Sequence, residues 1–269
     1  MDEIFIHILT GVFLIVVGLL VKRFPMLIAG YNTMPAEKKN PNAEMVAFCD
    51  IIEERAIKAN KEYGNETSKV YTDYKELLKD KSIDAVLVLT HNSEHCRITV
   101  DALNAGKTVV TANKALMATH GKEIFDAAEK NGVEILFEAS VGGGIPIIQP
   151  MKHQLTGNEI TSVLGIVNGT TNYMLTRMED GLSYDEALKE AQERGFAEAD
   201  PTADVEGQDA AAKIAILSSI AFNSRVVLED VYTEGISTIK QIDLHYAKEM
   251  GYRVKLLAIA HKLDDGIDV

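Results

Sequence analysis

Residues 85–110 read AVLVLTHNSEHCRITVDALNAGKTVV, and the fold class follows from them. The apolar run AVLVLT at 85–90 is typical of a strand buried on both faces of a sheet. The next stretch predicts a helix over 93–105, with Gly106 suited to its C-terminus. TVVTA at 108–112 predicts a second strand. A strand, a helix and a strand with short connections indicate parallel strands joined by a right-handed crossover.

The same alternation continues on both sides of this unit. Towards the N-terminus, MVAFC at 45–49 predicts a strand, residues 53–63 a helix, and YTDYKELLKD a short helix capped near Thr72. Towards the C-terminus, residues 121–131 predict a helix and VEILFEA at 133–139 a strand. The pattern predicts an α/β protein with an incomplete doubly wound, Rossmann-like parallel sheet, a class that binds nucleotides.

Asp50, directly after the strand at 45–49, has two interpretations. At the end of the second strand it could accept hydrogen bonds from the adenosine ribose of NAD, and it would repel the 2′-phosphate of NADP. It could equally be a helix N-cap. The G-x-G-x-x-G turn expected about twenty residues upstream is missing from the sequence before Asp50, where Gly30 stands alone in GYNTM.

Composition narrows the class of protein. The 269 residues carry 27 Lys and Arg against 40 Asp and Glu, a formal charge of −13. Such an acidic chain argues against nucleic-acid binding, which needs clustered positive charge. The only cysteines, Cys49 and Cys96, exclude a disulfide scaffold, lack the spacing of a zinc motif, and favour a reducing compartment such as the cytoplasm.

Residues 4–21, IFIHILTGVFLIVVGLLV, carry no formal charge and approach the length of a transmembrane helix. Asp2 and Glu3 precede this run, and Lys22 and Arg23 follow it. Positive charge on the C-terminal side predicts that this side faces the cytoplasm, so the remainder of the chain would be membrane-anchored there. The alternative is a buried strand–helix unit of a globular core.

Three segments resemble known families. GYNTMPAEKK at 30–39 resembles a motif after the first helix of small, uncharacterised bacterial membrane proteins. Residues 44–107 are similar to the glucose–fructose oxidoreductase family, in which the loop containing the equivalent of Thr90 borders the cofactor. That family next shows an E-K-P motif. This sequence instead reads TANKALMA at 111–118, a signature of homoserine dehydrogenase, and that resemblance continues to the C-terminus.

The segment AQERGFAEADPTADVEGQDAAAK at 191–213 carries the most specific resemblance to homoserine dehydrogenase. From the residues alone, Asp209 and Lys213 share one helix face at i,i+4, and acidic residues crowd the preceding loop. Such an arrangement could hold a substrate ammonium group beside a proton-transfer lysine, or it could be a solvated acidic surface. The resemblance implies oxidation of L-homoserine to L-aspartate 4-semialdehyde, a step of threonine and methionine biosynthesis, with NAD or NADP.

The same resemblance implies roles for individual residues. Lys213 would exchange the proton on the substrate oxygen, Asp209 would position Lys213 and the substrate, and Lys114 would orient the reacting groups beside the nicotinamide. Glu198 would bind the substrate ammonium group. Further substrate-binding residues are expected around VNGTTNYML and in the acidic loop: Asn168, Gly169, Thr170, Thr171 and Asp204.

FEASVGGGIPII at 137–148 is a glycine-rich strand-to-helix turn. Such a turn permits close approach of the backbone to a ligand such as the nicotinamide, and it could also be a plain tight turn. Gly142 and Gly143 are therefore candidate cofactor-binding residues, with Asp50, Thr90 and Lys114. In homoserine dehydrogenases the corresponding loop holds a monovalent cation, here Na⁺, and the match assigns to it Glu138, Val141, Gly143 and Ile145.

The predicted organisation has three parts: a hydrophobic leader at 1–40, a partial NAD(P)-binding domain at 41–140, and an α+β substrate and dimerisation domain at 141–269. Relative to homoserine dehydrogenase, we expect both ends to be shortened. The family resemblance implies a homodimer. The alternative function is a membrane-anchored inactive homologue or interaction module. A sugar dehydrogenase of the glucose–fructose oxidoreductase kind is disfavoured because E-K-P is absent.

Overall fold

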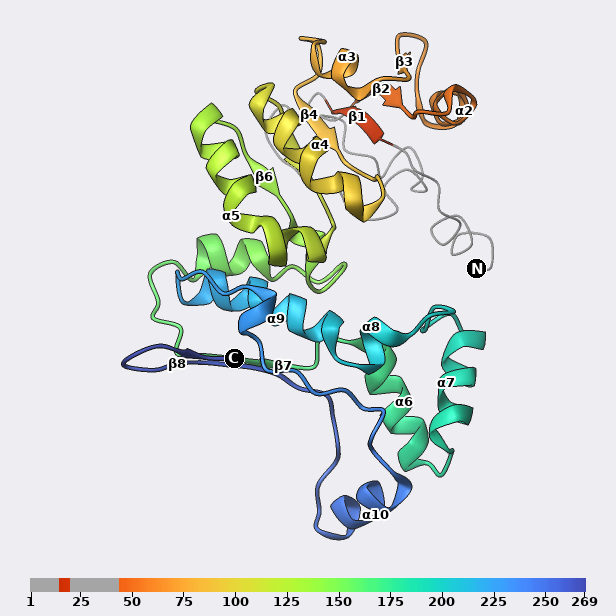
Figure 1. The fold of residues 1–269 in the computed structure, drawn as a ribbon, viewed down its shortest axis with the longest axis vertical. Helices are drawn as coiled ribbons and strands as arrows, with labels where there is room; N and C mark the ends of the chain where they lie inside the picture. Colours follow the sequence, from red (N-terminus) through yellow and green to blue (C-terminus); the bar gives the residue numbers. More distant parts are fainter. Residues whose placement is uncertain (1–14, 20–43) are drawn as a thin grey trace. The chain divides into compact units, whose positions relative to one another are not determined.

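A computed structural model describes residues 15–19 and 44–269, and it divides the chain into two compact units, one up to Ile147 and one from Ile148 (Figure 1). For residues 15–19 only the backbone is described. The predicted domain boundary, after residue 140, lies close to this division. Each unit is described below by itself.

The first unit is built on a six-stranded sheet with strand order β3-β2-β1-β4-β5-β6. The pairs β2–β3, β4–β5 and β5–β6 are parallel, as predicted for a doubly wound sheet. The strands span β1 Ile15–Leu19, β2 Met45–Cys49, β3 Lys69–Tyr71, β4 Ala85–Leu87, β5 Thr108–Val110 and β6 Ile135–Leu136. The helices span α2 Glu53–Tyr63, α3 Tyr74–Leu78, α4 Asn92–Asn104 and α5 Lys114–Asn131.

β1 departs from the prediction in two ways. Ile15–Leu19 falls inside the run predicted as a transmembrane helix, yet its backbone is a strand, so the helix prediction is wrong for these five residues. β1 also runs antiparallel to both of its neighbours, β2 and β4. IVVGL is apolar and rich in β-branched residues, and a short apolar run of this kind does not distinguish a helix from a buried strand. The rest of residues 4–21 lies outside the described residues.

Among the described residues, no helix combines the length and the apolar character needed to cross a bilayer.

The helix predicted over 121–131 begins earlier than expected, because Asn113 caps it. The Asn113 side-chain oxygen accepts a hydrogen bond from the Leu116 amide at 2.9 Å, which starts α5 at Lys114. Gly121 therefore lies within the helix, where it was expected to begin it. As expected, Gly106 adopts the left-handed conformation just after α4, with φ 73°.

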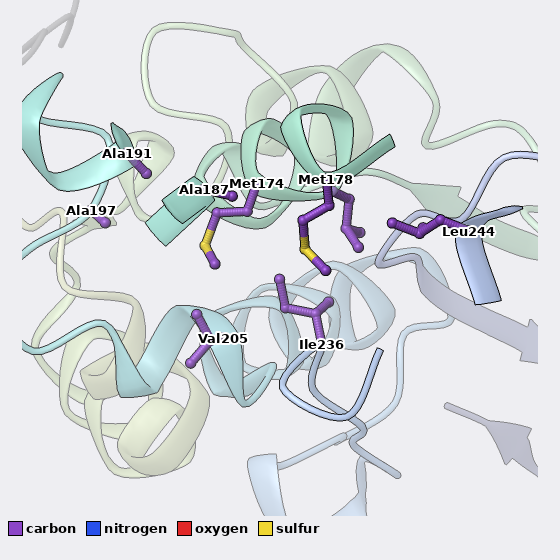
Figure 2. Packing of buried hydrophobic residues seen from close by; sticks show 9 residues of the cluster. Met174, Met178, Ala187, Ala191, Ala197, Val205, Ile236 and Leu244 are labelled. Carbon is purple, nitrogen blue, oxygen red and sulfur yellow. The ribbon is translucent and has the colours of Figure 1, made fainter. Parts of the chain in front are cut away.

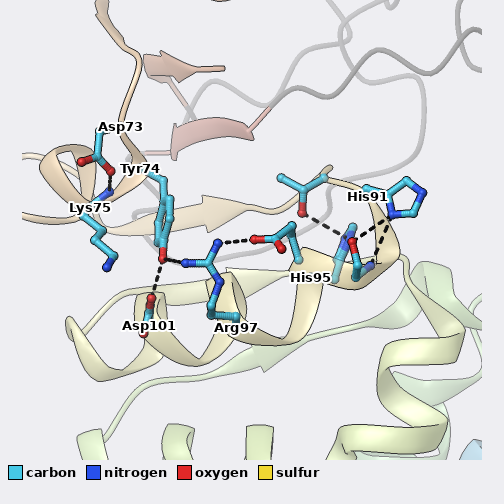
Figure 3. A network of polar contacts seen from close by, with 10 residues as sticks. Asp73, Tyr74, Lys75, His91, His95, Arg97 and Asp101 are labelled. Atoms are coloured by element: carbon cyan, nitrogen blue, oxygen red, sulfur yellow. Dashed lines mark hydrogen bonds and ion pairs between the residues drawn. The ribbon is translucent and has the colours of Figure 1, made fainter. Parts of the chain in front are cut away.

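A polar network ties α3 to α4 (Figure 3). The Tyr74 hydroxyl donates to Asp101 at 2.7 Å and accepts from Arg97 at 2.7 Å. The buried His95 ring bonds to the Val88 carbonyl at 3.0 Å, directly after β4. These contacts fix the start of α4 against the end of β4, where the Thr90 loop lies.

Asp80, before β4, accepts four hydrogen bonds through its carboxylate. Lys69 and Tyr71 donate to Oδ2 at 2.6 and 2.8 Å, and the Ser82 hydroxyl and amide donate to Oδ1 at 2.7 and 2.9 Å. Its side chain is only 12% exposed. Led by the ammonium group of Lys69, these donors hold the pKa of the Asp80 carboxyl well below its usual range.

Asp80→Asn should therefore change the pH dependence of stability. Because the folded-state pKa lies below the unfolded value of about 3.9, the carboxylate stabilises the fold above that pH and the stabilisation fades as pH falls further. We expect the variant to be less stable than the parent at pH 7, with the difference shrinking towards pH 3. Urea unfolding at both pH values measures this. The exposed Asp126, paired with Lys122, provides the control D126N, and an equal response of both variants would contradict the assignment.

The second unit combines an antiparallel three-stranded sheet, order β7-β8-β9, with a group of helices. This agrees with the α+β arrangement predicted for this part of the chain. The strands span β7 Ser162–Gly165, β8 Ala258–Lys262 and β9 Ile267–Asp268. The helices span α6 Gly169–Glu179, α7 Tyr184–Glu193, α8 Thr202–Val205, α9 Gln208–Ala221 and α10 Gln241–Glu249.

A hydrophobic cluster of this unit fixes α6, whose first turn carries candidate substrate-binding residues, against α7 and α8. Met174 and Met178 of α6 project towards Val205 of α8 and Ile236 (Figure 2), and all four are buried. Ala187 completes the contact from α7. α6 is thereby held on a packed scaffold.

Gly207, the residue before α9, permits a close crossing of two backbone segments. Its φ of 81° is left-handed, and a Cβ placed on it would lie 2.7 Å from the Glu234 carbonyl oxygen. Any side chain would force the loop away from α9. Glycine at this position therefore fixes where α9 begins, at Gln208, the residue before Asp209.

Candidate active site

Lys213 and Asp209 form an ion pair on α9, as their i,i+4 spacing predicts. Lys213 Nζ donates to Asp209 Oδ2 at 2.6 Å and to the Val167 carbonyl at 2.7 Å. The Asp209 carboxylate is 6% exposed and the Lys213 side chain 17%. The lysine is thus held at its tip by a buried carboxylate and by the end of the segment that leads from β7 to α6.

Asn168 connects this pair to a second carboxylate. Its Nδ2 donates to Asp209 Oδ2 at 2.8 Å and to Asp204 Oδ1 at 2.7 Å. Its Oδ1 accepts from the amide and the hydroxyl of Thr171, at 2.9 and 2.8 Å, which makes it the N-cap of α6. Four hydrogen bonds use every donor of the amide group. Asn168, a predicted substrate-binding residue, is thus bonded to both neighbouring carboxylates.

The ammonium group of Lys213 has one N–H donor available for a ligand. An ammonium group has three N–H donors, and in the described part of the chain two of them have acceptors. The third can donate to a substrate oxygen. The surroundings are acidic, since Asp209 contacts Lys213 and Asn168 joins Asp209 to Asp204, so they favour a cationic ligand group.

The remaining substrate-side candidates lie at the start of α6 and in the loop before α8. The Thr170 hydroxyl donates to the Phe196 carbonyl at 2.6 Å, and both Thr170 and Thr171 are buried. Thr170 therefore anchors the loop that continues to Glu198. Gly169 and Glu198 are exposed, and the Glu198 carbonyl accepts from Gln192 at 3.0 Å.

In the first unit, the candidate cofactor residues lie at one edge of the sheet. Cys49 of β2 pairs with Ile15, and Leu87 of β4 pairs with Val16, so the carboxyl ends of both strands meet the amino end of β1. β5 and β6 run parallel to β4. The segments that hold Asp50, Thr90, Lys114 and the glycine loop all follow the carboxyl ends of these strands, the edge at which doubly wound sheets bind ligands.

Asp50 fits the ribose of a dinucleotide. Its side chain is 3% exposed, and its Oδ1 accepts from the Ile52 amide at 2.8 Å, so it lies in the turn before α2 while Ile52 takes the N-cap position. Its Oδ2 is buried and has no hydrogen-bond partner among the described residues. A buried acceptor without a donor is costly, and a ribose hydroxyl would satisfy it. Burial, with Asp50 beside it, raises the pKa of the Cys49 thiol to about 12.

The structure fits the pyrophosphate of a dinucleotide less well than it fits the ribose. In a doubly wound fold, the glycine turn follows the carboxyl end of the first strand, at the ligand edge. Because β1 is antiparallel, its carboxyl end, Leu19, pairs with Met45 at the opposite edge. In the described part of the chain, the carboxyl end of β1 therefore lies away from Asp50.

The glycine loop after β6 contains the four residues proposed for a cation. Glu138 begins a short 3-10 helix and accepts from the Ile147 amide through Oε1 at 2.6 Å. Gly142 and Gly143 have left-handed φ values of 78° and 57°, and a Cβ on Gly142 would lie 2.9 Å from the Ile145 carbonyl oxygen. Val141 is buried, whereas the Ile145 side chain is 72% exposed. The loop thus closes as a tight turn, in which the Ile145 amide donates to the Gly142 carbonyl at 3.0 Å.

One site residue was missed from the sequence. The Val167 carbonyl holds Lys213, but a backbone acceptor has no signature of residue type. Its position just before the N-cap Asn168 is the only signal the sequence offers.

Comparisons with known proteins agree with cofactor candidates in the first unit and substrate candidates in the second. Residues 146–269 match the model of the homoserine dehydrogenase family, and residues 26–138 match that of an oxidoreductase family with an NAD-binding Rossmann fold. The homoserine dehydrogenase of Corynebacterium glutamicum is 51% identical over 188 residues, which cover 69% of this chain and 42% of that enzyme. These matches confirm the two resemblances predicted for the corresponding segments.

Two solved structures are similar in fold as well as in sequence. A homoserine dehydrogenase from Thiobacillus denitrificans has a TM-score of 0.72 and 46% identity, covering 78% of this chain and 49% of that one. A hyperthermophilic archaeal homoserine dehydrogenase in complex with NADPH has a TM-score of 0.63 and 26% identity, covering 81% and 65%. The chain spans about half the length of the curated relatives it matches.

Proposed function

We propose that this chain interconverts L-homoserine and L-aspartate 4-semialdehyde with a nicotinamide cofactor. The premise is that it is related to the homoserine dehydrogenases along most of its length. The observation that carries the proposal is the ion pair of Lys213 with Asp209, whose carboxylate also accepts from Asn168, at the junction of α6 and α9. A lysine held by a buried carboxylate, with a third donor available, suits proton transfer at an alcohol or carbonyl oxygen.

The roles of the residues follow from this geometry. In the direction of reduction, Lys213 donates a proton to the aldehyde oxygen; in the direction of oxidation, it takes the hydroxyl proton. Asp209 and the Val167 carbonyl fix the position of its ammonium group. Asp204 and Asp209, joined by Asn168, keep the surroundings negative, and Glu198 binds the substrate ammonium group.

NAD or NADP supplies the hydride carrier of this reaction. Asp50 would hold the adenosine ribose, with Thr90 and the glycines 142 and 143 lining the same edge of the sheet. Lys114, at the first turn of α5, would orient the reacting groups beside the nicotinamide. A sodium ion held by carbonyl groups of Val141, Gly143 and Ile145 with Glu138 would fix the glycine loop, and activity measured with and without sodium tests that assignment.

The function is tested by following homoserine-dependent formation of reduced nicotinamide. The full chain is assayed in mild detergent with NAD and NADP in parallel. A rate that requires homoserine and disappears when Lys213 is replaced supports the proposal. No rate with either cofactor, from a chain shown to be folded, contradicts it and leaves an inactive homologue.

Asp50→Ser should weaken the use of NAD. The buried Oδ2 has no partner in the described residues, so its loss removes a charged hydrogen bond to the ribose diol, worth roughly 10-fold to 100-fold in affinity. The KM for NAD should rise by that factor, and the KM for NADP should not rise. Serine retains an oxygen for the Ile52 amide, which protects the turn. An equal rise for both cofactors would assign Asp50 a purely structural role.

Association of two copies is proposed through the open face of the second unit's sheet. Leu164 and Ile259 pair across β7 and β8 and are 66% and 40% exposed, whereas Ala258 and Ala260 are buried on the other face. An exposed apolar pair on a sheet suits an interface between copies of this chain. Sedimentation should give a dimer that Leu164→Lys with Ile259→Lys converts to a monomer, and an unchanged sedimentation coefficient would exclude this face.

Placement of the catalytic part in the cytoplasm is the proposal that agrees with free thiols at Cys49 and Cys96. Membrane association through residues 4–21 stays a prediction, tested by whether the expressed chain sediments with the membrane fraction of cells.

A further inference from the structure

Three side chains outside the proposed active site gather on the surface of the first unit. They are Cys96 of α4 with His120 and Glu123 of α5, and the thiol, imidazole and carboxylate ligand atoms all lie within 4.8 Å of one another. The Cys96 thiol is 3.6 Å from Glu123 Oε2, and His120 Nδ1 is 4.0 Å from the same oxygen. Glu123 thus stands between the other two.

The helices place these groups without depending on any ligand. His120 and Glu123 are separated by three residues and therefore share one face of α5, a spacing that helical metal sites use for histidine and glutamate. Cys96 faces them from α4. Ile98 and Ile124, the near neighbours of Cys96 and Glu123, are 4% and 0% exposed, so the two helix faces are anchored by the core.

The spacing matches the ligand geometry of a tetrahedral metal ion. Zinc bonds of about 2.3 Å to sulfur and 2.0–2.1 Å to nitrogen and oxygen place tetrahedral ligand atoms roughly 3.3–3.5 Å apart. The observed separations of 3.6 and 4.0 Å need only small side-chain adjustments to reach this range. His120 and Glu123 are exposed, which leaves the fourth position open to water.

We propose that Cys96, His120 and Glu123 bind one soft divalent cation, Zn²⁺ or its probe Cd²⁺, and so cross-link α4 to α5. A thiolate with an imidazole selects zinc and cadmium over magnesium and calcium, which prefer oxygen ligands only. The thiol proton is released to solvent as the metal–sulfur bond forms. The site uses ligands from two helices, so sequence spacing between cysteines could not reveal it.

The test measures metal binding by the full chain, freed of metal with a chelator and kept reduced. Calorimetric titration with Zn²⁺ should give one tight site, and Cd²⁺ should produce the ultraviolet charge-transfer absorption of a cadmium–thiolate bond. Cys96→Ser, His120→Gln and Glu123→Gln should each weaken Zn²⁺ binding by at least about 10-fold, since even partners that only orient a ligand account for 10-fold to 100-fold. All three positions are on the helix surface, so the variants should fold.

The matched control is His245→Gln. His245 pairs with Glu249 at 3.2 Å on α10, a surface histidine–glutamate pair on a single helix, and the control should bind Zn²⁺ as the parent does. The proposal is overturned if Cys96→Ser binds Zn²⁺ with unchanged affinity, if no cadmium–thiolate band appears, or if Mg²⁺ competes equally. Dehydrogenase activity plays no part in these readouts.

Discussion

Lys213→Ala should lower kcat/KM for homoserine by about 100-fold to 10,000-fold, the usual contribution of a positioned proton-transfer group. The third N–H of Lys213 is the donor assigned to the substrate oxygen, and alanine removes it together with the contacts to Asp209 and Val167. The measurement is the initial rate of homoserine-dependent nicotinamide reduction, with circular dichroism and thermal unfolding confirming that the variant is folded.

Two further variants distinguish proton transfer by Lys213 from the effect of its positive charge. Lys213→Arg keeps a cation beside Asp209, but a guanidinium group does not release its proton near neutral pH, so this variant should also be inactive. Lys189→Ala removes an exposed lysine paired with Glu193 on α7 and should keep the parent rate. A Lys213→Arg variant with normal turnover would show that Lys213 contributes only its charge.

Asn168→Asp should destabilise the second unit by on the order of 3–5 kcal/mol, the cost of leaving buried charges uncompensated. The substitution keeps the oxygen that caps α6 and replaces the Nδ2 donor between Asp204 and Asp209 by a third carboxylate. Urea unfolding at pH 8 measures the loss. Because like charges favour protonation of the introduced carboxyl group, the loss should become smaller as pH is lowered towards 5.

Asn168→Ser is the matched variant. Serine is about as good an N-cap as asparagine, so it preserves the start of α6 but removes the link between the two carboxylates without adding charge. It should cost only about 1–2 kcal/mol and still reduce turnover, since Asp209 loses a contact that positions Lys213. Equal stability of the serine and aspartate variants at pH 8 would show that no electrostatic bridge exists.

The sequence was sufficient for those parts of the fold in which local pattern and tertiary structure agree. The unit at 85–110 folds as predicted, because an apolar strand, a capped helix and Gly106 all favour the same arrangement. The predicted start of α5 at Gly121 is wrong, because Asn113 caps the helix and it begins at Lys114.

The sequence predicts which residues belong to the candidate site, but not which of them contact one another. Asp209 and Lys213 follow from i,i+4 spacing, but the contact of Asn168 with Asp209 joins residues 41 positions apart, which no local pattern encodes. The unpartnered oxygen of Asp50 depends equally on burial in the folded unit. The direction of β1 was unpredictable for another reason, since its apolar run suits a helix or a strand of either direction.

The position of β1 has a consequence for how the first unit folds. In the order β3-β2-β1-β4-β5-β6, β2 and β4 pair with β1 and not with each other. The β2–β3 and β4–β5–β6 pairings close shorter stretches of chain and can form separately, whereas joining them needs Ile15–Leu19 inserted between two preformed edges. Until that insertion, both edges are open to pairing with another copy. We therefore expect the insertion of this five-residue strand to compete with self-association while the unit folds.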